Sequence, residues 1–194
     1  MTKLTSRPRA DDPLGIVGQL DAADERARSI ACGLTDAQGA WRPRPTATSV
    51  AASLVRYLCW LRRTVPVLRS AVHGVRSGWR ARLGEVRSGV WWSLVPQLAE
   101  HSPILPLGEA DARAECTGRP VRSIMGEILL LHGEVRRLAR EGEVRDLRTA
   151  SVRLTLLPSI RMPIDVALAL VPAMARRYLR RAERVRLDAR FPAR

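Results

Sequence analysis

The chain has 194 residues, an apolar content of 46% and a formal net charge of +14. This length suits one domain with a sizeable core, and the apolar content argues against a wholly disordered chain. The three cysteines are odd in number and lack CxxC spacing, which indicates neither a disulfide framework nor a zinc knuckle. Lys3 is the only lysine and asparagine is absent, a bias typical of a GC-rich bacterial genome.

Residues 1–11 predict a flexible N-terminus without the apolar segment of a secretory signal. The longest apolar stretch, residues 166–175, is shorter than the roughly 20 residues that span a bilayer. These features predict a cytoplasmic protein.

The first predicted helix begins at Asp11, Asp12 and Pro13, residue types that suit a first helical turn, and ends at Gly33. Its apolar residues recur with helical spacing at Ile16, Leu20, Ala23, Ala27 and Ile30. A stiff connection follows, with Pro43 and Pro45.

The second predicted helix has the most regular apolar pattern of the chain. One face carries Val50, Leu54, Tyr57, Leu61, Val65, Leu68 and Val72. Because proline lacks an N–H group and clashes with the preceding turn, Pro66 is expected to kink this helix or to end it near Val65.

Residues 73–118 contain several glycines and prolines and give no clear third helix. Residues 91–98 are consistent with a short buried helix, and residues 109–115 with another. A long helix is predicted again over 121–141. Its apolar face is Val121, Ile124, Ile128, Leu131, Val135 and Leu138.

Residues 151–157 alternate apolar and polar side chains, which predicts a strand or an extended strap. The last predicted helix is expected to kink at Pro172. Its apolar face is Ile164, Leu168, Val171, Ala175, Tyr178, Ala182 and Val185. Residues 152–194 hold ten arginines against three carboxylates, which is half the net charge of the chain.

Two blocks of this sequence, residues 34–63 and 119–141, resemble the DinB-like superfamily of four-helix bundles. In chain order the matching features are the turn Leu34-Thr35-Asp36, the loop Arg42-Pro43-Arg44-Pro45, the second predicted helix and the helix end Arg140-Glu141. The resemblance implies an antiparallel four-helix bundle over residues 12–150. Residues 151–194 would then be a basic C-terminal extension, with an additional helix that packs on the bundle.

The resemblance also implies a divalent metal held by three histidines on two helices. Here His132 matches one ligand position and Tyr57 another, and the third falls on Val135 or Arg136. A metal site of this kind takes three protein ligands and an open position. Because Tyr57 and Val135 lie in the apolar faces of their helices, we predict a degenerate site. His132 would then be a histidine at the bundle edge, hydrogen-bonded to a carbonyl or to Tyr57.

Other candidate residues give weaker signals. His73 and His101 lie in the poorly patterned middle and could complete a rearranged site. Cys59 is read as a small buried hydrophobic residue, with a thiol facing a bound low-molecular-weight thiol as its alternative role.

The arginines of the last predicted helix lie off its apolar face, and their charge suits contact with nucleic acid or an anionic membrane surface. These residues are Arg176, Arg177, Arg180, Arg181 and Arg184. A solvated helix face is the alternative interpretation.

Relatives of the resembled superfamily include mycothiol- and bacillithiol-dependent transferases and maleylpyruvate isomerases, in which a metal activates a thiol. Three hypotheses follow for this chain. The first is a diverged small-molecule binding or interaction module with a degenerate metal site, either monomeric or a homodimer. The second is a metal- and thiol-dependent transferase or isomerase with a rearranged site. The third is a basic accessory protein that contacts nucleic acid or a membrane.

Overall fold

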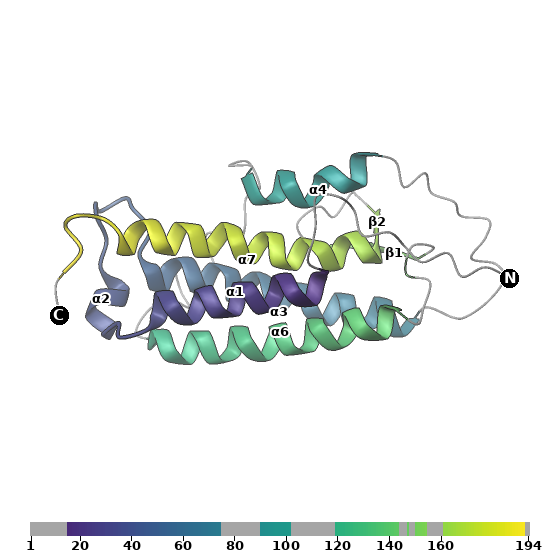
Figure 1. Cartoon of the computed structure of the whole chain (residues 1–194), viewed down its shortest axis with the longest axis horizontal. Coiled ribbons are helices and arrows are strands. Elements are labelled where there is room, and N and C mark those ends of the chain that lie inside the picture. Colours follow the sequence, from purple (N-terminus) through teal and green to yellow (C-terminus); the bar gives the residue numbers. More distant parts are fainter. Residues whose placement is uncertain are drawn as a thin grey trace, which may run out of the picture.

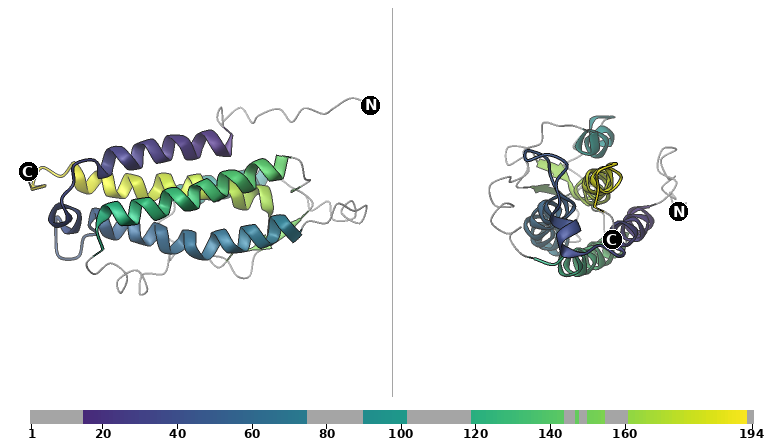
Figure 2. Two further views of the ribbon diagram at one scale, coloured as in Figure 1. Left: turned by 90° about the horizontal axis from the view of Figure 1, so that it is seen from below. Right: turned by 90° about the vertical axis from the view of Figure 1, so that its left-hand side faces the viewer.

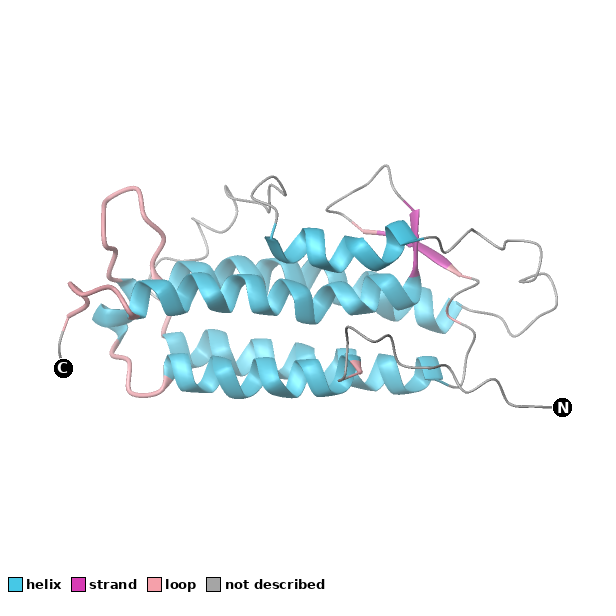
Figure 3. Cartoon of the chain, turned by 45° about the horizontal axis from the view of Figure 1, so that its top comes forward, coloured by secondary structure: helices cyan, strands magenta, loops and turns pink. Residues whose placement is uncertain are grey.

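A computed structural model describes residues 15–74, 90–101, 119–143, 147, 150–154 and 161–192. These residues form six helices and one small two-stranded sheet at one end of the molecule (Figures 1 and 3). The helices are α1 (Ile16–Ala31), α2 (Asp36–Ala40), α3 (Val50–Gly74), α4 (Val90–His101), α6 (Val121–Glu143) and α7 (Ile164–Arg186). The predicted all-helical character is confirmed, with the short strands β1 (Ser151–Arg153) and β2 (Arg161–Pro163) added to it.

Helix α1 follows the predicted apolar pattern, with Leu20, Ala23, Ala27 and Ile30 buried. Gly33 lies just beyond its end with a φ of 69°, in the left-handed region that glycine adopts without steric penalty. The predicted stop is therefore confirmed. The predicted start at residues 11–13 lies outside the described residues.

Helix α2 is short and was not predicted. Thr35 caps its N-terminus by accepting a hydrogen bond from the Gln38 N–H, and the Gln38 side chain accepts one in return from the Thr35 N–H. This reciprocal capping box satisfies two N–H groups that would otherwise lack partners. Gln38 also donates to the carbonyl of Pro192, and Trp41 meets Phe191 edge to face, so α2 holds the end of the chain.

Helix α3 continues through Pro66, so of the two predicted alternatives the end near Val65 is wrong, and the kink at Pro66 stays a prediction. Proline removes one backbone hydrogen bond, but residues on both sides of it are fully buried, including Val65, Leu68 and Val72. Burial of this face on either side of Pro66 offsets the local loss. Helix α7 likewise continues through Pro172.

Helices α1, α3, α6 and α7 lie side by side around one apolar core (Figure 2). Helix α7 packs against α1, α3 and α4, and most of its residues between Ile164 and Val185 are buried. Residues 151–194 were predicted to form a basic extension that packs on the bundle. In the structure α7 is instead an integral part of the core, because its apolar face is wide enough to cover several neighbouring helices at once.

Helix α4 lies on the outer side of α7. The predicted short helix at residues 91–98 is therefore confirmed and extended, but Leu94 and Leu98 are 38% and 57% exposed, so this part of it is not buried as expected. The second short helix predicted at 109–115 lies outside the described residues.

Strands β1 and β2 pair antiparallel, with Val152 opposite Met162. Both side chains are buried against the helices. The predicted extended segment at 151–157 is thus a strand over 151–153, whereas residues 155–160 are not described. Its partner strand was not predicted. None of the described helices has the length and apolar character needed to cross a membrane.

Candidate functional site: a buried polar network

The helical core contains a connected set of polar side chains. Asp24 comes from α1, Tyr57 from α3, and His132 and Arg136 from α6. Asp24, Tyr57 and His132 are only 2%, 1% and 0% exposed. His132 and Arg136 are four residues apart, so α6 projects both from one face. We call these four residues the polar network.

Hydrogen bonds join the network from end to end. The Tyr57 hydroxyl lies 2.6 Å from His132 Nε2, and His132 Nδ1 lies 2.5 Å from Asp24 Oδ1. Arg136 donates from Nη2 to the other carboxylate oxygen of Asp24. The Tyr57 hydroxyl also lies 3.3 Å from the Val171 carbonyl oxygen. The network thus links α1, α3, α6 and α7.

The network keeps Asp24 ionised. Burial by itself would raise the pKa of this carboxyl, but hydrogen bonds from His132 and Arg136, together with the charge of Arg136, lower it. The effect is reciprocal at Arg136. Burial by itself would lower the pKa of the Arg136 guanidinium, but the hydrogen bond to Asp24 and the charge of Asp24 raise this pKa.

Tyr57 stays protonated. Its burial, and then the negative charge of Asp24, raise the pKa of the phenol well above its usual value of 10.0. Because the Asp24 carboxylate can only accept, His132 Nδ1 must carry the hydrogen between them. In a neutral imidazole Nε2 is then the acceptor for the Tyr57 hydroxyl. The predicted hydrogen bond between His132 and Tyr57 is confirmed, but His132 is fully buried and not at an edge.

These residues do not fit a divalent metal. A ligating histidine often donates its second N–H to a carboxylate, as His132 does to Asp24. However, the Tyr57 hydroxyl occupies the Nε2 side where a metal would bind, and a protonated phenol is a poor ligand. Arg136 adds a positive charge beside the same carboxylate. Within the described part of the chain, no three His, Cys, Asp or Glu side chains come together as metal ligands.

Of the two residues considered for the third ligand position, Val135 is fully buried among apolar side chains. Arg136 instead shares Asp24 with His132. Val135 belongs to the apolar face of α6, whereas Arg136 lies beside that face, and the sequence pattern left open which of the two adjacent positions matched the third ligand. The structure places Arg136, not Val135, in the polar network.

The network reaches the surface at Arg136. An open depression of about 680 Å³ lies over this end, lined by Asp21, Asp24, Glu25, Arg28 and Arg136. Arg136 Nε is 2.8 Å from Asp21 Oδ1, and the two side chains form an ion pair at the depression. Carboxylates and guanidiniums therefore line one depression next to the polar network.

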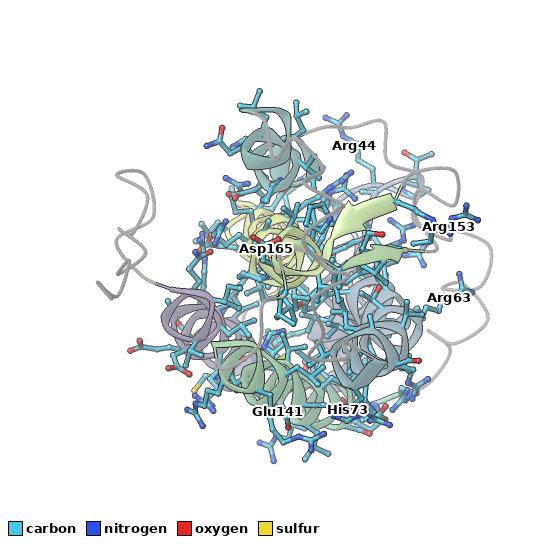
Figure 4. The ribbon with its side chains drawn as sticks, turned by 90° about the vertical axis from the view of Figure 1, so that its right-hand side faces the viewer. Arg44, Arg63, His73, Glu141, Arg153 and Asp165 are labelled. Atoms are coloured by element: carbon cyan, nitrogen blue, oxygen red, sulfur yellow. The ribbon has the colours of Figure 1, made fainter. Side chains whose placement is uncertain are left out.

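The other candidate residues lie elsewhere. His73 is exposed at the end of α3, 3.2 Å from Glu141 of α6, and Figure 4 labels the two residues side by side. His101 is exposed, and its Nδ1 lies 3.0 Å from the Gln97 carbonyl oxygen. Neither histidine joins the polar network. Cys59 packs against the margin of the core but is half-buried, so it is less buried than predicted.

The arginines of α7 make more internal contacts than their spacing predicts. Arg176 and Arg180 both pair with Glu100 of α4, and Arg177 is buried with its Nη1 3.0 Å from the Ala99 carbonyl oxygen. Arg181 lies over the Tyr178 ring, while Arg184 is exposed. All five arginines were predicted to lie on one face turned away from the core, because the position of α4 could not be predicted from the sequence.

Asp24 was not singled out from the sequence. A signal was present, since Asp24 lies four residues after Leu20 and three before Ala27, on the apolar face of its helix. A carboxylate at such a position requires a buried partner. That partner belongs to α6, more than a hundred residues away, so the sequence could not identify it.

Comparison with known proteins gives no matching family model, no matching curated protein and no matching solved structure. The DinB-like resemblance therefore stays a prediction.

Proposed function

We propose that this chain is a diverged DinB-like protein in which α1, α3, α6 and α7 form the four-helix bundle and the polar network stands where relatives hold a metal. In this proposal the protein acts as a small-molecule binding or interaction module. One observation supports it most directly: both ring nitrogens of His132 are occupied, Nε2 by the Tyr57 hydroxyl and Nδ1 by the Asp24 carboxylate. A histidine held on both sides has no nitrogen left for a metal.

The residues that resemble the superfamily occupy positions consistent with this proposal. Tyr57 and His132 come from the two helices that would supply the ligands, and their side chains meet. An enzyme of the thiol-transferase type would also need substrate to reach the hydroxyl or imidazole. Both groups are sealed in the core, which favours binding over catalysis at this place.

The depression over Arg136 is the candidate ligand site of the module. Its mixed charges suit a small polar molecule that carries both an amine and a carboxylate, as many low-molecular-weight thiols do. Thermal-shift measurements with cysteine and with glutathione test this. We expect stabilisation that is lost in Arg28→Ala and kept in Arg122→Ala, an exposed arginine outside the depression. Equal responses of both variants would contradict the location of the site.

Restoring the missing ligands tests the ancestry of the site. The double variant Tyr57→His with Arg136→His should bind one equivalent of Zn²⁺, because His132 and residue 136 share a helix face and residue 57 meets His132. Metal content of the purified protein, measured by mass spectrometry after dialysis, is the readout. The matched control is Tyr57→His with Val135→His, which should bind none.

Two results would overturn this proposal. One is a stoichiometric metal in the unmodified protein that disappears on His132→Ala. The other is a restored variant that folds, as judged by circular dichroism, but binds no metal. Transfer of a thiol to an activated chloroarene by the unmodified protein would favour the transferase alternative instead.

A further inference from the structure

Several partly buried arginines of the described residues are matched by a carboxylate. Ion pairs join Arg119 to Glu127, Arg136 to Asp24, and both Arg176 and Arg180 to Glu100. A guanidinium stays charged at any accessible pH, and burying it without a counter-charge is unfavourable. Such pairing is therefore expected for every arginine taken out of water.

Arg177 departs from this pattern. It is only 5% exposed, and its hydrogen bond in the described part of the structure is to the Ala99 carbonyl oxygen. No carboxylate of the described residues pairs with it. Desolvation, and then the positive charge of Arg181, lower the pKa of this guanidinium. Among the described residues, Arg177 thus meets a carbonyl oxygen and a cationic neighbour but no counter-charge.

Two further arginines lie around the same place. Arg181 is one turn along α7, with its guanidinium carbon 5.8 Å from the centroid of the Tyr178 ring. Arg56 reaches from α3 and donates to the Thr48 hydroxyl. Neither of these half-buried residues pairs with a carboxylate among the described residues. We call Arg56, Arg177 and Arg181 the arginine cluster.

Tyr178 follows Arg177 in α7, and its ring lies beneath the guanidinium of Arg181. Its ring is 1% exposed and packs beside Tyr57. Burial raises the pKa of the Tyr178 hydroxyl to about 12, although Arg177, Arg181 and Arg56 each act to lower it. The phenol therefore remains a hydrogen-bond donor among three cations, which is an environment that favours an anionic acceptor.

We infer that Arg56, Arg177 and Arg181 bind a small oxyanion, the phosphate or carboxylate group of a small molecule, with the Tyr178 hydroxyl as a further donor. Guanidinium groups match such oxygens in geometry and charge. Arg56 and Arg181 are half-buried, which leaves a route from solvent. This site lies on α3 and α7 and does not depend on the function proposed for the polar network.

Inorganic phosphate and acetate are the probes, each titrated into the full chain at constant ionic strength in a chloride buffer. The readout is the set of arginine side-chain Nε–Hε resonances, with the signal of Arg177 assigned by its loss in Arg177→Met. We expect that signal to shift saturably with one or both probes. A response to phosphate alone identifies a phosphate site, and a response to acetate a carboxylate site.

Variants distinguish a specific oxyanion site from the general attraction of anions to a basic protein. Arg181→Met should weaken binding about tenfold or more, as loss of a charged hydrogen-bond donor does. Arg184→Met, which removes an exposed arginine of the same helix, should leave the affinity unchanged. Tyr178→Phe keeps the ring and all three cations and should weaken binding by a smaller factor.

Two outcomes would overturn the inference. An Arg177 signal that does not move with either probe would show that this residue only anchors the end of α4. Equal weakening by Arg181→Met and Arg184→Met would show screening of the overall positive charge.

Discussion

Asp24 illustrates how one residue can couple several helices. It lies in α1 and accepts from His132 and Arg136 of α6, while His132 in turn meets Tyr57 of α3. Removing one partner from such a buried set leaves the others without compensation. The network therefore fixes the relative positions of these helices, in addition to any role in binding.

Replacement of Asp24 should make this coupling measurable. We expect Asp24→Asn to reduce the free energy of unfolding near neutral pH by about 3 kcal/mol, because the buried His132 and the half-buried Arg136 lose their carboxylate. Denaturant unfolding is the measurement. Asp21→Asn is the matched control, since the Asp21 side chain is 63% exposed and its pair should contribute under about 1 kcal/mol.

The same variant predicts a pH dependence. The pKa of Asp24 is lowered in the folded state, so its contribution is complete above the unfolded value of about 4 and is lost as the pH falls through the lower folded value. The stability difference between the unmodified protein and Asp24→Asn should therefore shrink below about pH 4. A difference that stays constant down to pH 2 would contradict the ionised state of Asp24.

At the scale of single elements, the apolar pattern predicted the long helices well, the alternative that α3 ends near Val65 was wrong, and kinks at Pro66 and Pro172 stay predictions. Helices α3 and α7 continue through Pro66 and Pro172, although each proline removes a backbone hydrogen bond. The pattern was the better guide, because it repeats over many turns while proline acts on one. Helix α2 was missed because five residues carry too little periodicity, although its capping box is present in the sequence.

Pro66 offers a test of this balance. It lies on the exposed side of α3, so an alanine there should fit and restore the missing hydrogen bond. We expect Pro66→Ala to stabilise the protein by about 1–3 kcal/mol, which calorimetry would detect as a higher Tm. A lower Tm would show that the proline supports a bend that the packing of α3 requires.

At the scale of the whole molecule, α7 and α4 decide how the charge is used. Helix α7 lies within the core, and α4 packs on its outer side so that its C-terminal end meets three of the arginines. The half of the net charge carried by the C-terminal region is thus partly turned inward. Contact with nucleic acid or a membrane through Arg176, Arg177 and Arg180 would require α4 to move.

Glu100 is the main polar anchor of α4. Its carboxylate, 12% exposed, accepts from Arg176 at 2.8 Å and pairs with Arg180 at 2.7 Å. We expect Glu100→Ala to raise amide hydrogen exchange across residues 90–101 about tenfold or more, because the charged hydrogen bond from Arg176 and the ion pair with Arg180 are lost. The exposed Glu25 provides the control, and Glu25→Ala should leave exchange in α4 unchanged.

The sequence by itself determined the helical class and the apolar faces of α1, α3, α6 and α7, which follow from local periodicity. For His132 it left two partners open, a carbonyl or Tyr57, and the structure shows Tyr57. Only the tertiary structure decided that Asp24 and Arg136 complete the network, that α7 belongs to the core and that α4 covers its arginines. The physical reason is that these features depend on contacts between helices distant in sequence, which no local pattern encodes.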